Sequence, residues 1–585
     1  MHLYHDSQRL LCRSPLGAAP CGARVRLRLR AAEPLQSALL RFYDGSEKWI
    51  PMEKEQDGWY AAVAVMPEIP ILCWYDFRVA DMDGHVIAYG GPADGMGGEG
   101  LETDCPRAWQ ITVYDPGYKT PAFMREGVMY QIFPDRFYRS GAAHPRREEI
   151  VYHEDWQDTP LLIPEGKDDN CARDFFGGDL QGIREKLPYL QALGVTVLYL
   201  NPVFMARSNH RYDTADYTRI DPLLGDNGDF AALCRDAKAA GIRVVLDGVF
   251  SHTGEDSVYF NRLGRFPVVG ACQSTQSPYY SWYTFTRYPD EYKCWWNFHT
   301  LPEVNKTDPG YQAFILGKDG VARSWVRQGS AGWRLDVADE LPMDFLRKLR
   351  AAVKAENPDA LVLGEVWEDA SHKVAYGEMR CYCQGDTLDS VMNYPLRAAA
   401  IDFFTGRADA FALCRLIRSQ QENYPAPFYY SLMNLTGSHD RPRSINALCG
   451  STWEKLPQPQ RGPMRLTAEE YALGKARYVA MLRLLCALPG IPCVYYGDEA
   501  GLQGASDPFC RGTFPWGKED AALQSQVRAL LQARRQSPAL QTGTLEVTAV
   551  DADTLRIVRE IRDGRDVFGK PAANERAEIE IRRTI

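Results

Sequence analysis

The chain has 585 residues, of which 45% are hydrophobic and 24% are charged, and its formal net charge is −9. This composition is typical of folded globular proteins and argues against extended disorder, and the length suggests about four domain-sized units. An acidic chain does not provide the basic surface that nucleic-acid binding requires, so we expect no nucleic-acid partner. The sequence contains no run of about 18 apolar residues, which argues against a membrane span. The first residues contain no apolar core of secretory length, and we therefore expect a cytoplasmic location.

Residues 1–118 are predicted to form an N-terminal β-sandwich. The segment 24–30 alternates arginine with an apolar residue, so that its apolar side chains share one face of a strand. Further β-type runs at 59–65 and 75–79 are separated from their neighbours by Asp-Gly turn signals. Short strands connected by such turns are most simply accommodated in two packed antiparallel sheets.

From residue 119 to about 540, short β-rich runs alternate with segments of helical periodicity. Eight such runs occur, at 128–133, 195–200, 243–250, 332–337, 361–367, 389–394, 428–435 and 492–497. Eight strands alternating with helices predict an α/β fold, a closed (β/α)8 TIM barrel. The connection after the third run is unusually long, so residues 252–306 are expected to form an inserted loop domain. Residues 541–585 contain few strand signals and predict a short, truncated C-terminal β domain.

Charged and polar side chains cluster where four of the predicted strands end. Because the carboxyl ends of barrel strands meet at one mouth, we expect these residues to become neighbours. A buried carboxylate such as Asp336 needs a partner, and Arg334, two residues earlier, points to the same face and can provide it. The residues are Asp247 and His252 after the third strand, Arg334, Asp336 and Glu340 at the fourth, Glu365 at the fifth, and His439 and Asp440 after the seventh.

Eight segments together resemble the α-amylase family of glycoside hydrolases. In chain order they read GVTVLYLNPVF, HRYDTADY, LDGVFSH, LPEVN, GWRLDVADE, GEVW, TGSHD and PGIPCVYYGDEAG. The resemblance covers residues 121 to 540. The β-rich N-terminal region and the segments WWNFHT, LPEVN and MNYP are most similar to the subgroup of neopullulanases, cyclomaltodextrinases and maltogenic amylases.

The resemblance implies a role for each matching residue. Asp336 would be the nucleophile, Glu365 the general acid and base, and Asp440 the third carboxylate, which stabilises the transition state. Arg334 would orient Asp336 and balance its charge. The other residues that the resemblance implies for substrate binding are His252, His439, Tyr212, His210, Asp247, Trp367 and Arg443.

The implied activity is retaining hydrolysis of α-1,4-glucosidic bonds in cyclomaltodextrins, pullulan or maltooligosaccharides. It would proceed by double displacement through a covalent glycosyl–Asp336 intermediate, with an α-glucan as the substrate partner and no organic cofactor. Transglycosylase or α-glucosidase activity would use the same residues, so these alternatives stay open. A non-catalytic glucan-binding protein is a more distant alternative, because decayed relatives typically lose the nucleophile or the acid/base.

Three departures from the family pattern carry further expectations. Gly177 and Asp179 match half of a calcium site found in related enzymes, but the Asn/Asp half is missing, and Asp179 also suits a helix N-cap. Glu368 stands where the subgroup often has histidine, and Asp339 stands where relatives often have asparagine; both are expected near the acceptor sites. The subgroup also suggests a homodimer through the N-terminal domain, with an exposed aromatic face around Trp49, Trp59 and Trp74.

Overall fold

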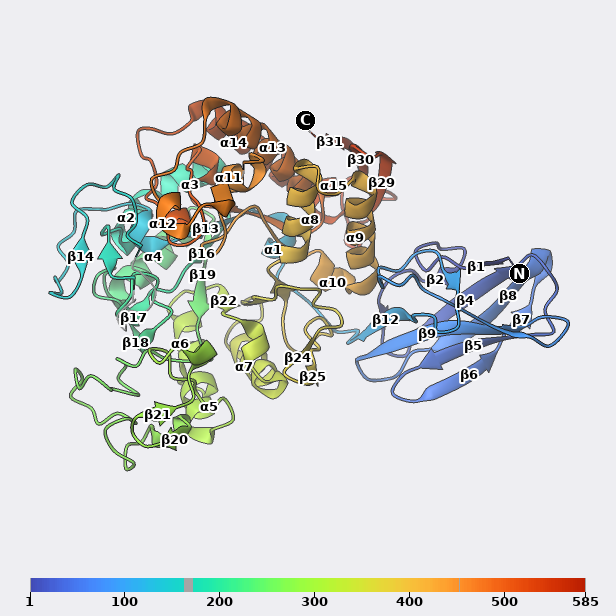
Figure 1. Cartoon of the computed structure of the whole chain (residues 1–585), viewed down its shortest axis with the longest axis horizontal. Helices are drawn as coiled ribbons and strands as arrows, with labels where there is room; N and C mark the ends of the chain where they lie inside the picture. The colour runs from blue at the N-terminus through green and yellow to red at the C-terminus, as the bar shows by residue number, and fades with distance from the viewer. Residues whose placement is uncertain (1, 163–171, 452, 584–585) are drawn as a thin grey trace.

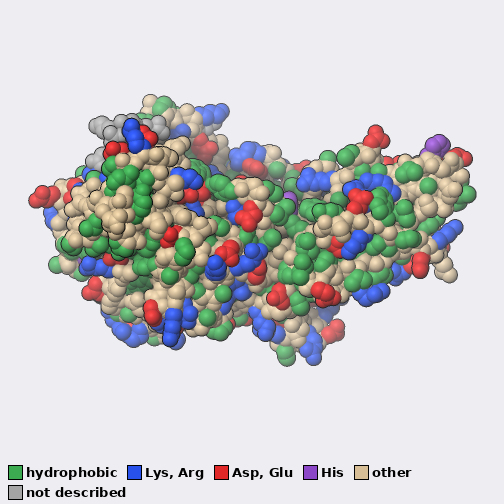
Figure 2. All heavy atoms as spheres, turned by 90° about the horizontal axis from the view of Figure 1, so that it is seen from below, with side chains coloured by type: hydrophobic (Ala, Val, Ile, Leu, Met, Phe, Trp, Pro, Cys, Tyr) green, Lys and Arg blue, Asp and Glu red, His purple; other side chains and the backbone are tan. Residues whose placement is uncertain are grey.

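The computed structural model describes residues 2–162, 172–451 and 453–583. Figure 1 shows an elongated molecule with the N-terminal strands at one end and the helices and strands of the larger α/β part at the other. Figure 2 shows acidic and basic side chains interspersed over one face of the molecule. Within the described ranges, no helix combines the length and apolar character needed to cross a bilayer.

The N-terminal part consists of two sheets packed face to face. One sheet has the order β1-β4-β8-β7 with β2 paired to β4, and the other has the order β11-β10-β9-β12-β3 with β5 between β9 and β6. The apolar positions of β4 are buried and its four arginines are exposed or half-buried, as the alternating sequence predicts. The strands are β1 (Leu3–Tyr4), β2 (Arg13–Ser14), β3 (Ala19–Pro20), β4 (Arg24–Ala31), β5 (Ser37–Tyr43), β6 (Glu47–Pro51), β7 (Glu53–Lys54), β8 (Trp59–Val65), β9 (Ile71–Ala80), β10 (Val86–Gly90), β11 (Leu101–Glu102) and β12 (Trp109–Tyr114).

The eight predicted barrel strands are present and form one parallel sheet in the order β26-β23-β22-β19-β16-β13-β28-β27. A parallel bridge between Met392 and Met433 joins the two outer strands, so the sheet is nearly closed. The predicted TIM-barrel fold class is therefore confirmed. The strands are β13 (Met129–Ile132), β16 (Val197–Leu200), β19 (Arg243–Gly248), β22 (Gly332–Leu335), β23 (Leu361–Gly364), β26 (Ser390–Val391), β27 (Met433–Leu435) and β28 (Ile491–Tyr495).

The helices that follow these strands cover the outside of the barrel. The main ones are α4 (Asn227–Ala239), α5 (Pro309–Leu316), α6 (Val321–Arg327), α7 (Met343–Glu356), α8 (Tyr394–Phe404), α9 (Ala410–Asn423), α13 (Ala468–Ala487) and α14 (Ala521–Gln536). The apolar spacing of residues 180–193 predicts one helix, but the segment forms two, α2 (Leu180–Glu185) and α3 (Leu187–Leu193), with Pro188 in the first turn of α3. Proline lacks the backbone N–H that a continuous helix would need there.

The predicted seventh strand is shorter than its apolar run. Residues 426–429 form the helical turn α10 (Ala426–Tyr429), and β27 begins only at Met433. Pro425 and Pro427 flank the start of this turn, where proline fits a helix and disfavours a strand. The prediction of a strand from residue 428 was wrong at its first five positions.

Two further segments complete the molecule. Between β19 and α5, residues 252–306 contain the short strands β20 (Phe285–Arg287) and β21 (Glu291–Tyr292) and two 3-10 turns, η3 (Tyr280–Trp282) and η4 (Trp295–Asn297). The C-terminal strands β29 (Thr544–Asp551), β30 (Thr554–Ile561) and β31 (Glu575–Arg582) form a three-stranded antiparallel sheet. This sheet packs on α9, α13 and α15 (Pro538–Thr542).

Candidate active site

A cavity of about 790 Å³ opens where the barrel strands end. Residues of the loops that follow β22, β23 and β27 line it together with residues of the inserted segment 252–306. Of the residues singled out in the sequence, the cavity is lined by His210, Tyr212, His252, Asp336, Asp339, Glu340, Glu365, Trp367, Glu368, His439 and Asp440. Residues from separate strand ends therefore share one hollow, as the barrel geometry predicts.

A single buried guanidinium holds three carboxylates at the base of this cavity. Arg334 lies in β22, and its Nη1 donates to Asp247 Oδ1 at 2.8 Å and to Asp336 Oδ1 at 2.9 Å. Its Nη2 lies 2.8 Å from Glu365 Oε2, although without hydrogen-bond geometry. In the register of the parallel sheet, Asp247 in β19 stands directly beside Arg334, so both side chains leave the sheet on the same side. The two carboxylates proposed to react are thus close enough to share one cation.

The backbone after β22 is strained at the point where Asp336 leaves the strand. Val337 has φ 34° and ψ 71°, a left-handed conformation that is unfavourable for a β-branched residue. Its N–H donates to Glu365 Oε2 at 2.9 Å. The strained turn therefore directs Asp336 toward the cavity and binds the carboxylate that follows β23, an arrangement common at functional sites.

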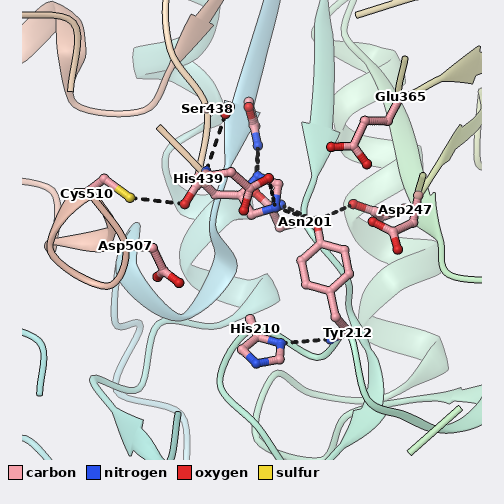
Figure 3. Close-up of polar contacts among 12 residues, drawn as sticks. Asn201, His210, Tyr212, Asp247, Glu365, Ser438, His439, Asp507 and Cys510 are labelled. Atoms are coloured by element: carbon pink, nitrogen blue, oxygen red, sulfur yellow. Dashed lines mark hydrogen bonds and ion pairs between the residues drawn. The ribbon is translucent and has the colours of Figure 1, made fainter. Parts of the chain in front are cut away.

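Tyr212 is the centre of a chain of hydrogen bonds that crosses the cavity floor (Figure 3). Gln131 Nε2 donates to His439 Nδ1 at 3.0 Å, which leaves the proton of His439 on Nε2. His439 Nε2 lies 2.6 Å from the Tyr212 hydroxyl, which in turn donates to Asp247 Oδ2 at 3.0 Å. The Tyr212 and His439 rings are stacked, with centroids 5.3 Å apart and an interplanar angle of 9°. These bonds fix the tyrosine ring in one orientation before any ligand binds.

The two other predicted histidines also contact Tyr212, through its backbone. His210 Nδ1 accepts from the Tyr212 N–H at 3.1 Å, and His252 Nε2 lies 3.1 Å from the Tyr212 carbonyl oxygen. Burial lowers the pKa of both His252 and His439 to about 3. At neutral pH these imidazoles are therefore uncharged and suited to hydrogen bonding with hydroxyl groups.

Asp440 is the most exposed of the three predicted catalytic carboxylates, with 33% of its side chain accessible. Its Oδ2 lies 3.2 Å from His439 Nε2, and its Oδ1 accepts from Arg511 Nη2 at 3.3 Å. Arg511 follows β28 and is itself paired with Asp507 at 2.8 Å. Arg511 was not among the predicted site residues, because no strand-end pattern marks the long segment after β28.

The pKa values of the three carboxylates are pushed in different directions. Burial raises the pKa of Asp336 and of Glu365; Arg334 opposes this rise, and neighbouring carboxylates add to it. Against the effect of burial, His439 and Arg511 lower the pKa of Asp440. Asp336 accepts a hydrogen bond from Arg334 Nη1, whereas Glu365 accepts one from the Val337 N–H and lies 2.8 Å from Arg334 Nη2, so both carboxylates have partners that favour the anion. The site can therefore hold a proton on one of the two carboxylates Asp336 and Glu365 while Asp440 is ionised.

Aromatic side chains form one wall and the rim of the cavity. Trp367, two residues after Glu365, stacks on Tyr394 with centroids 3.9 Å apart. Trp295 and Trp296, in the inserted segment, stack with centroids 4.8 Å apart, and Trp296 is 66% exposed. Exposed aromatic faces of this kind bind the apolar faces of sugar rings. The sequence shows that residues 252–306 contain runs of aromatic residues, but it does not show that these residues lie over the cavity.

Two of the predicted binding or metal residues are placed elsewhere. Arg443 does not line the cavity; it is fully buried and paired with Asp498 at 3.1 Å, and its role in substrate binding stays a prediction. Asp179 caps α2, and its oxygens accept from the Gly182 N–H, Ser140 Oγ at 2.6 Å and His144 Nε2 at 3.0 Å. A side chain whose two oxygens are already occupied by protein donors does not suit a calcium ion.

The matching family model is the α-amylase catalytic domain, aligned with residues 131–544. Among curated proteins, an amylopullulanase of Thermoanaerobacterium saccharolyticum is 37% identical, over 100% of this chain and 48% of its own length. A cyclomaltodextrinase of Geobacillus thermopakistaniensis is 35% identical over 79% of this chain and 71% of its own. The chain spans about half or less of the length of the amylopullulanases that it matches.

Solved structures with the same architecture include the following two. The cyclic α-maltosyl-(1→6)-maltose hydrolase of Arthrobacter globiformis, in complex with cyclic α-maltosyl-(1→6)-maltose, has a TM-score of 0.65 and 33% identity. This alignment covers 80% of this chain and 92% of the other. A cyclomaltodextrinase has a TM-score of 0.67 and 28% identity, covering 96% of this chain and 89% of the other.

Proposed function

Because this chain belongs to the α-amylase family of glycoside hydrolases, we propose that it cleaves α-1,4-glucosidic bonds in cyclomaltodextrins, pullulan or maltooligosaccharides with retention of configuration. The observation that carries this proposal is the contact of Asp336 and Glu365 with the two terminal nitrogens of Arg334. Retaining glycosidases need two carboxyl groups about 5–5.5 Å apart on either side of one bond. Two carboxylates that contact one guanidinium are close enough to act on one bond, which supports this proposal.

In the first step, Asp336 attacks the anomeric carbon, and Glu365 gives its proton to the leaving oxygen as the glucosidic bond breaks. In the second step, the oxygen of water bonds to the same carbon, Glu365 takes the water proton, and the bond to Asp336 breaks. Asp440, which Arg511 and His439 favour as an anion, would stabilise the positive charge that develops on the sugar ring. Neutral His252 and His439 would hydrogen-bond the sugar hydroxyls, and Tyr212 would stack beneath the ring.

The substrate class is argued from the shape and lining of the cavity. A volume of about 790 Å³ accommodates several sugar units, and the exposed Trp296 and Phe298 lie at its open side. The relatives include proteins named cyclomaltodextrinase, neopullulanase and maltogenic amylase. We therefore place bent or cyclic α-glucans among the expected substrates, and we expect the protein to act in the cytoplasm.

Product analysis tests the proposed bond specificity. The protein is incubated separately with γ-cyclodextrin, pullulan and soluble starch, and the products are separated by chromatography. Panose from pullulan indicates α-1,4 cleavage, and ring opening of γ-cyclodextrin faster than attack on starch indicates a cyclomaltodextrinase. Maltotriose from pullulan would indicate α-1,6 cleavage and would overturn the assignment of bond type.

The mechanism is tested by Asp336→Asn. We expect this variant to lose turnover by more than about 10³-fold while it keeps its fold, because an amide cannot form the glycosyl ester. Circular dichroism and thermal unfolding check the fold, and Glu340→Gln, at the rim of the same cavity, is the matched control that should keep measurable turnover. Wild-type rates from Asp336→Asn would contradict the mechanism.

A homodimer through the N-terminal domain remains a proposal. Of the three tryptophans expected on an exposed aromatic face, Trp49 is 48% exposed, whereas Trp59 is only 9% exposed and lies beneath the Arg28 guanidinium. The remaining aromatic face of β5, β6 and β9 is therefore smaller than the sequence suggested. Light scattering that gives one species of 66 kDa at micromolar concentration would argue against the dimer.

A further inference from the structure

Lys373 ties together two acidic side chains on one wall of the cavity. Its Nζ contacts a carboxylate oxygen of Asp339 and one of Glu368, and only 13% of the lysine side chain is exposed. Although burial acts in the opposite direction, Asp339 and Glu368 raise the pKa of Lys373, so the ammonium stays charged at neutral pH. All three residues line the cavity. Asp339 follows the proposed nucleophile by three residues, and Glu368 follows the proposed acid by three.

Lys373 is also the first residue of a hairpin that projects over the cavity. Strands β24 (Val374–Ala375) and β25 (Glu378–Met379) are joined by Tyr376 and Gly377, both with positive φ, as in a two-residue turn. The Lys373 carbonyl accepts from the Arg380 N–H at 2.8 Å, and the Arg380 guanidinium donates to the Asp339 carbonyl at 2.8 Å. The base of the hairpin is thus fastened to the segment that follows β22.

The tip of the hairpin meets the inserted segment across the opening of the cavity. The Tyr376 hydroxyl donates to Glu340 Oε1, and Trp296 Nε1 donates to the same oxygen at 3.2 Å. Tyr376 is 70% exposed, so these contacts are easily exchanged for contacts with a sugar. The hairpin therefore forms the wall on the side of Glu365 and Trp367, where a leaving group or an acceptor would bind.

We propose that Lys373 is a positioning residue that determines whether water or a sugar accepts the glycosyl group. Its contacts with Asp339 and Glu368 hold the β24–β25 hairpin against the side of the cavity where an acceptor sugar would bind. The inference rests on the proposed function, since an acceptor can compete with water only at a glycosyl–Asp336 intermediate. In transfer, a hydroxyl oxygen of the acceptor sugar bonds to the anomeric carbon, its proton passes to Glu365, and the bond to Asp336 breaks. An acceptor sugar is large enough to be held in place by the hairpin. A water molecule can reach the intermediate without contact with the hairpin.

The N-terminal part of the same chain supports this hairpin from behind. His372, directly before Lys373, makes an edge-to-face contact with Trp74 of β9, with ring centroids 6.3 Å apart. Figure 1 places β24 and β25 on the side of the barrel that faces the N-terminal strands. We therefore expect Trp74 to assist Lys373, with a smaller effect when it is removed.

The test uses α-maltosyl fluoride as donor, because fluoride leaves without occupying an acceptor site. Fluoride release reports formation of the intermediate, and chromatography with added maltose separates transfer products from hydrolysis. The variants are Lys373→Met, the conservative Lys373→Arg, and Glu368→Gln, whose 64% exposed side chain can change with little risk to folding. The matched control is Lys348→Met, which breaks an exposed lysine–carboxylate contact on α7, outside the cavity.

For Lys373→Met we expect kcat/KM for maltosyl fluoride within threefold of wild type, a maltose KM at least fivefold higher and a transfer-to-hydrolysis ratio at least fivefold lower. Glu368→Gln should change in the same direction, Lys373→Arg should keep the ratio within twofold, and Lys348→Met should behave as wild type. An unchanged maltose KM in Lys373→Met, or an equal loss of fluoride release and transfer, would overturn the role of Lys373. Wild-type protein that releases no fluoride would instead overturn the proposed function.

The contribution of the N-terminal part is tested on one face of its sheet. Trp74→Ala removes the contact with His372, whereas Trp49→Ala removes an aromatic side chain from the same face of the β5–β6–β9 sheet. We expect Trp74→Ala to lower the transfer-to-hydrolysis ratio about twofold and Trp49→Ala to leave it unchanged. Equal ratios in both variants would show that the hairpin needs no support from β9.

Discussion

Asp247 offers the most direct test of the electrostatics around Arg334, because it shares the guanidinium with Asp336 but is not proposed to react. Asp247 is buried, and its Oδ2 also accepts from the hydroxyls of Tyr199 and Tyr212. Burial raises the pKa of Asp336 and of Glu365, and the negative charge of Asp247 raises both further. The substitution Asp247→Asn keeps the shape of the side chain and removes that charge.

The size of the effect follows from the geometry. The nearest oxygens of Asp247 and Asp336 lie 2.8 and 2.9 Å from the same nitrogen of Arg334, so they are no more than about 6 Å apart. At an effective dielectric constant of about 20, two unit charges at about 6 Å repel by about 3 kcal/mol, which corresponds to about 2 pKa units. We therefore expect Asp247→Asn to lower the pKa of Asp336 by about one to two units and to lower the pKa of Glu365 in the same direction.

The assay is the pH dependence of kcat/KM between pH 4 and pH 9, with γ-cyclodextrin or starch, whichever is turned over faster. The acid limb reports ionisation of Asp336 and the alkaline limb reports loss of the proton from Glu365, so both limbs should move to lower pH. Asp344→Asn, an exposed carboxylate on α7, is the control and should leave both limbs in place. Limbs that stay fixed or move to higher pH in Asp247→Asn would refute the reasoning.

Two further predictions concern stability. Glu422→Ala should destabilise the protein by about 3–5 kcal/mol in urea unfolding, because it leaves Arg13 buried without the partner that lies 2.9 Å away. The double variant Arg13→Met/Glu422→Leu removes both charges and should recover much of this loss. Burial raises the pKa of Glu499 to about 7, so the folded state holds the carboxyl proton more tightly than the unfolded state does. The free energy of unfolding should therefore fall by about 3 kcal/mol as the pH rises from 4.5 to 8. Glu499→Gln should lack this part of the pH dependence; identical pH dependence in both proteins would contradict the assignment.

The parts of the site that could be predicted from sequence are those fixed by the barrel itself. Asp336 and Glu365 directly follow their strands, and the parallel register alone brings such positions together, whatever the loops do. Period-two alternation in β4 was equally decisive, because burial of one face leaves one register possible. These inferences needed no knowledge of loop conformation.

The parts that could not be predicted depend on long connections. Arg511 and Tyr376 reach the cavity from the segments after β28 and β23, whose paths are set by tertiary contacts and not by local periodicity. Arg443, which the resemblance implied for substrate binding, is buried against Tyr495 and Tyr496, and its position likewise depends on the path of the loop after β27.

The placement of the N-terminal sandwich has a consequence for how acceptor choice would depend on protein concentration. Arg13 reaches from the sandwich to buried Glu422 of α9, and the Thr112 hydroxyl donates to the Asn423 carbonyl at 2.6 Å, so the sandwich is bound to the barrel of its own chain. Trp74 then meets His372 within the same chain. Support given within one chain acts at every concentration, whereas a roof supplied by a second subunit would be lost on dilution. A transfer-to-hydrolysis ratio that stays constant from nanomolar to micromolar protein would thus favour the internal contact, and a ratio that falls on dilution would point to a partner subunit.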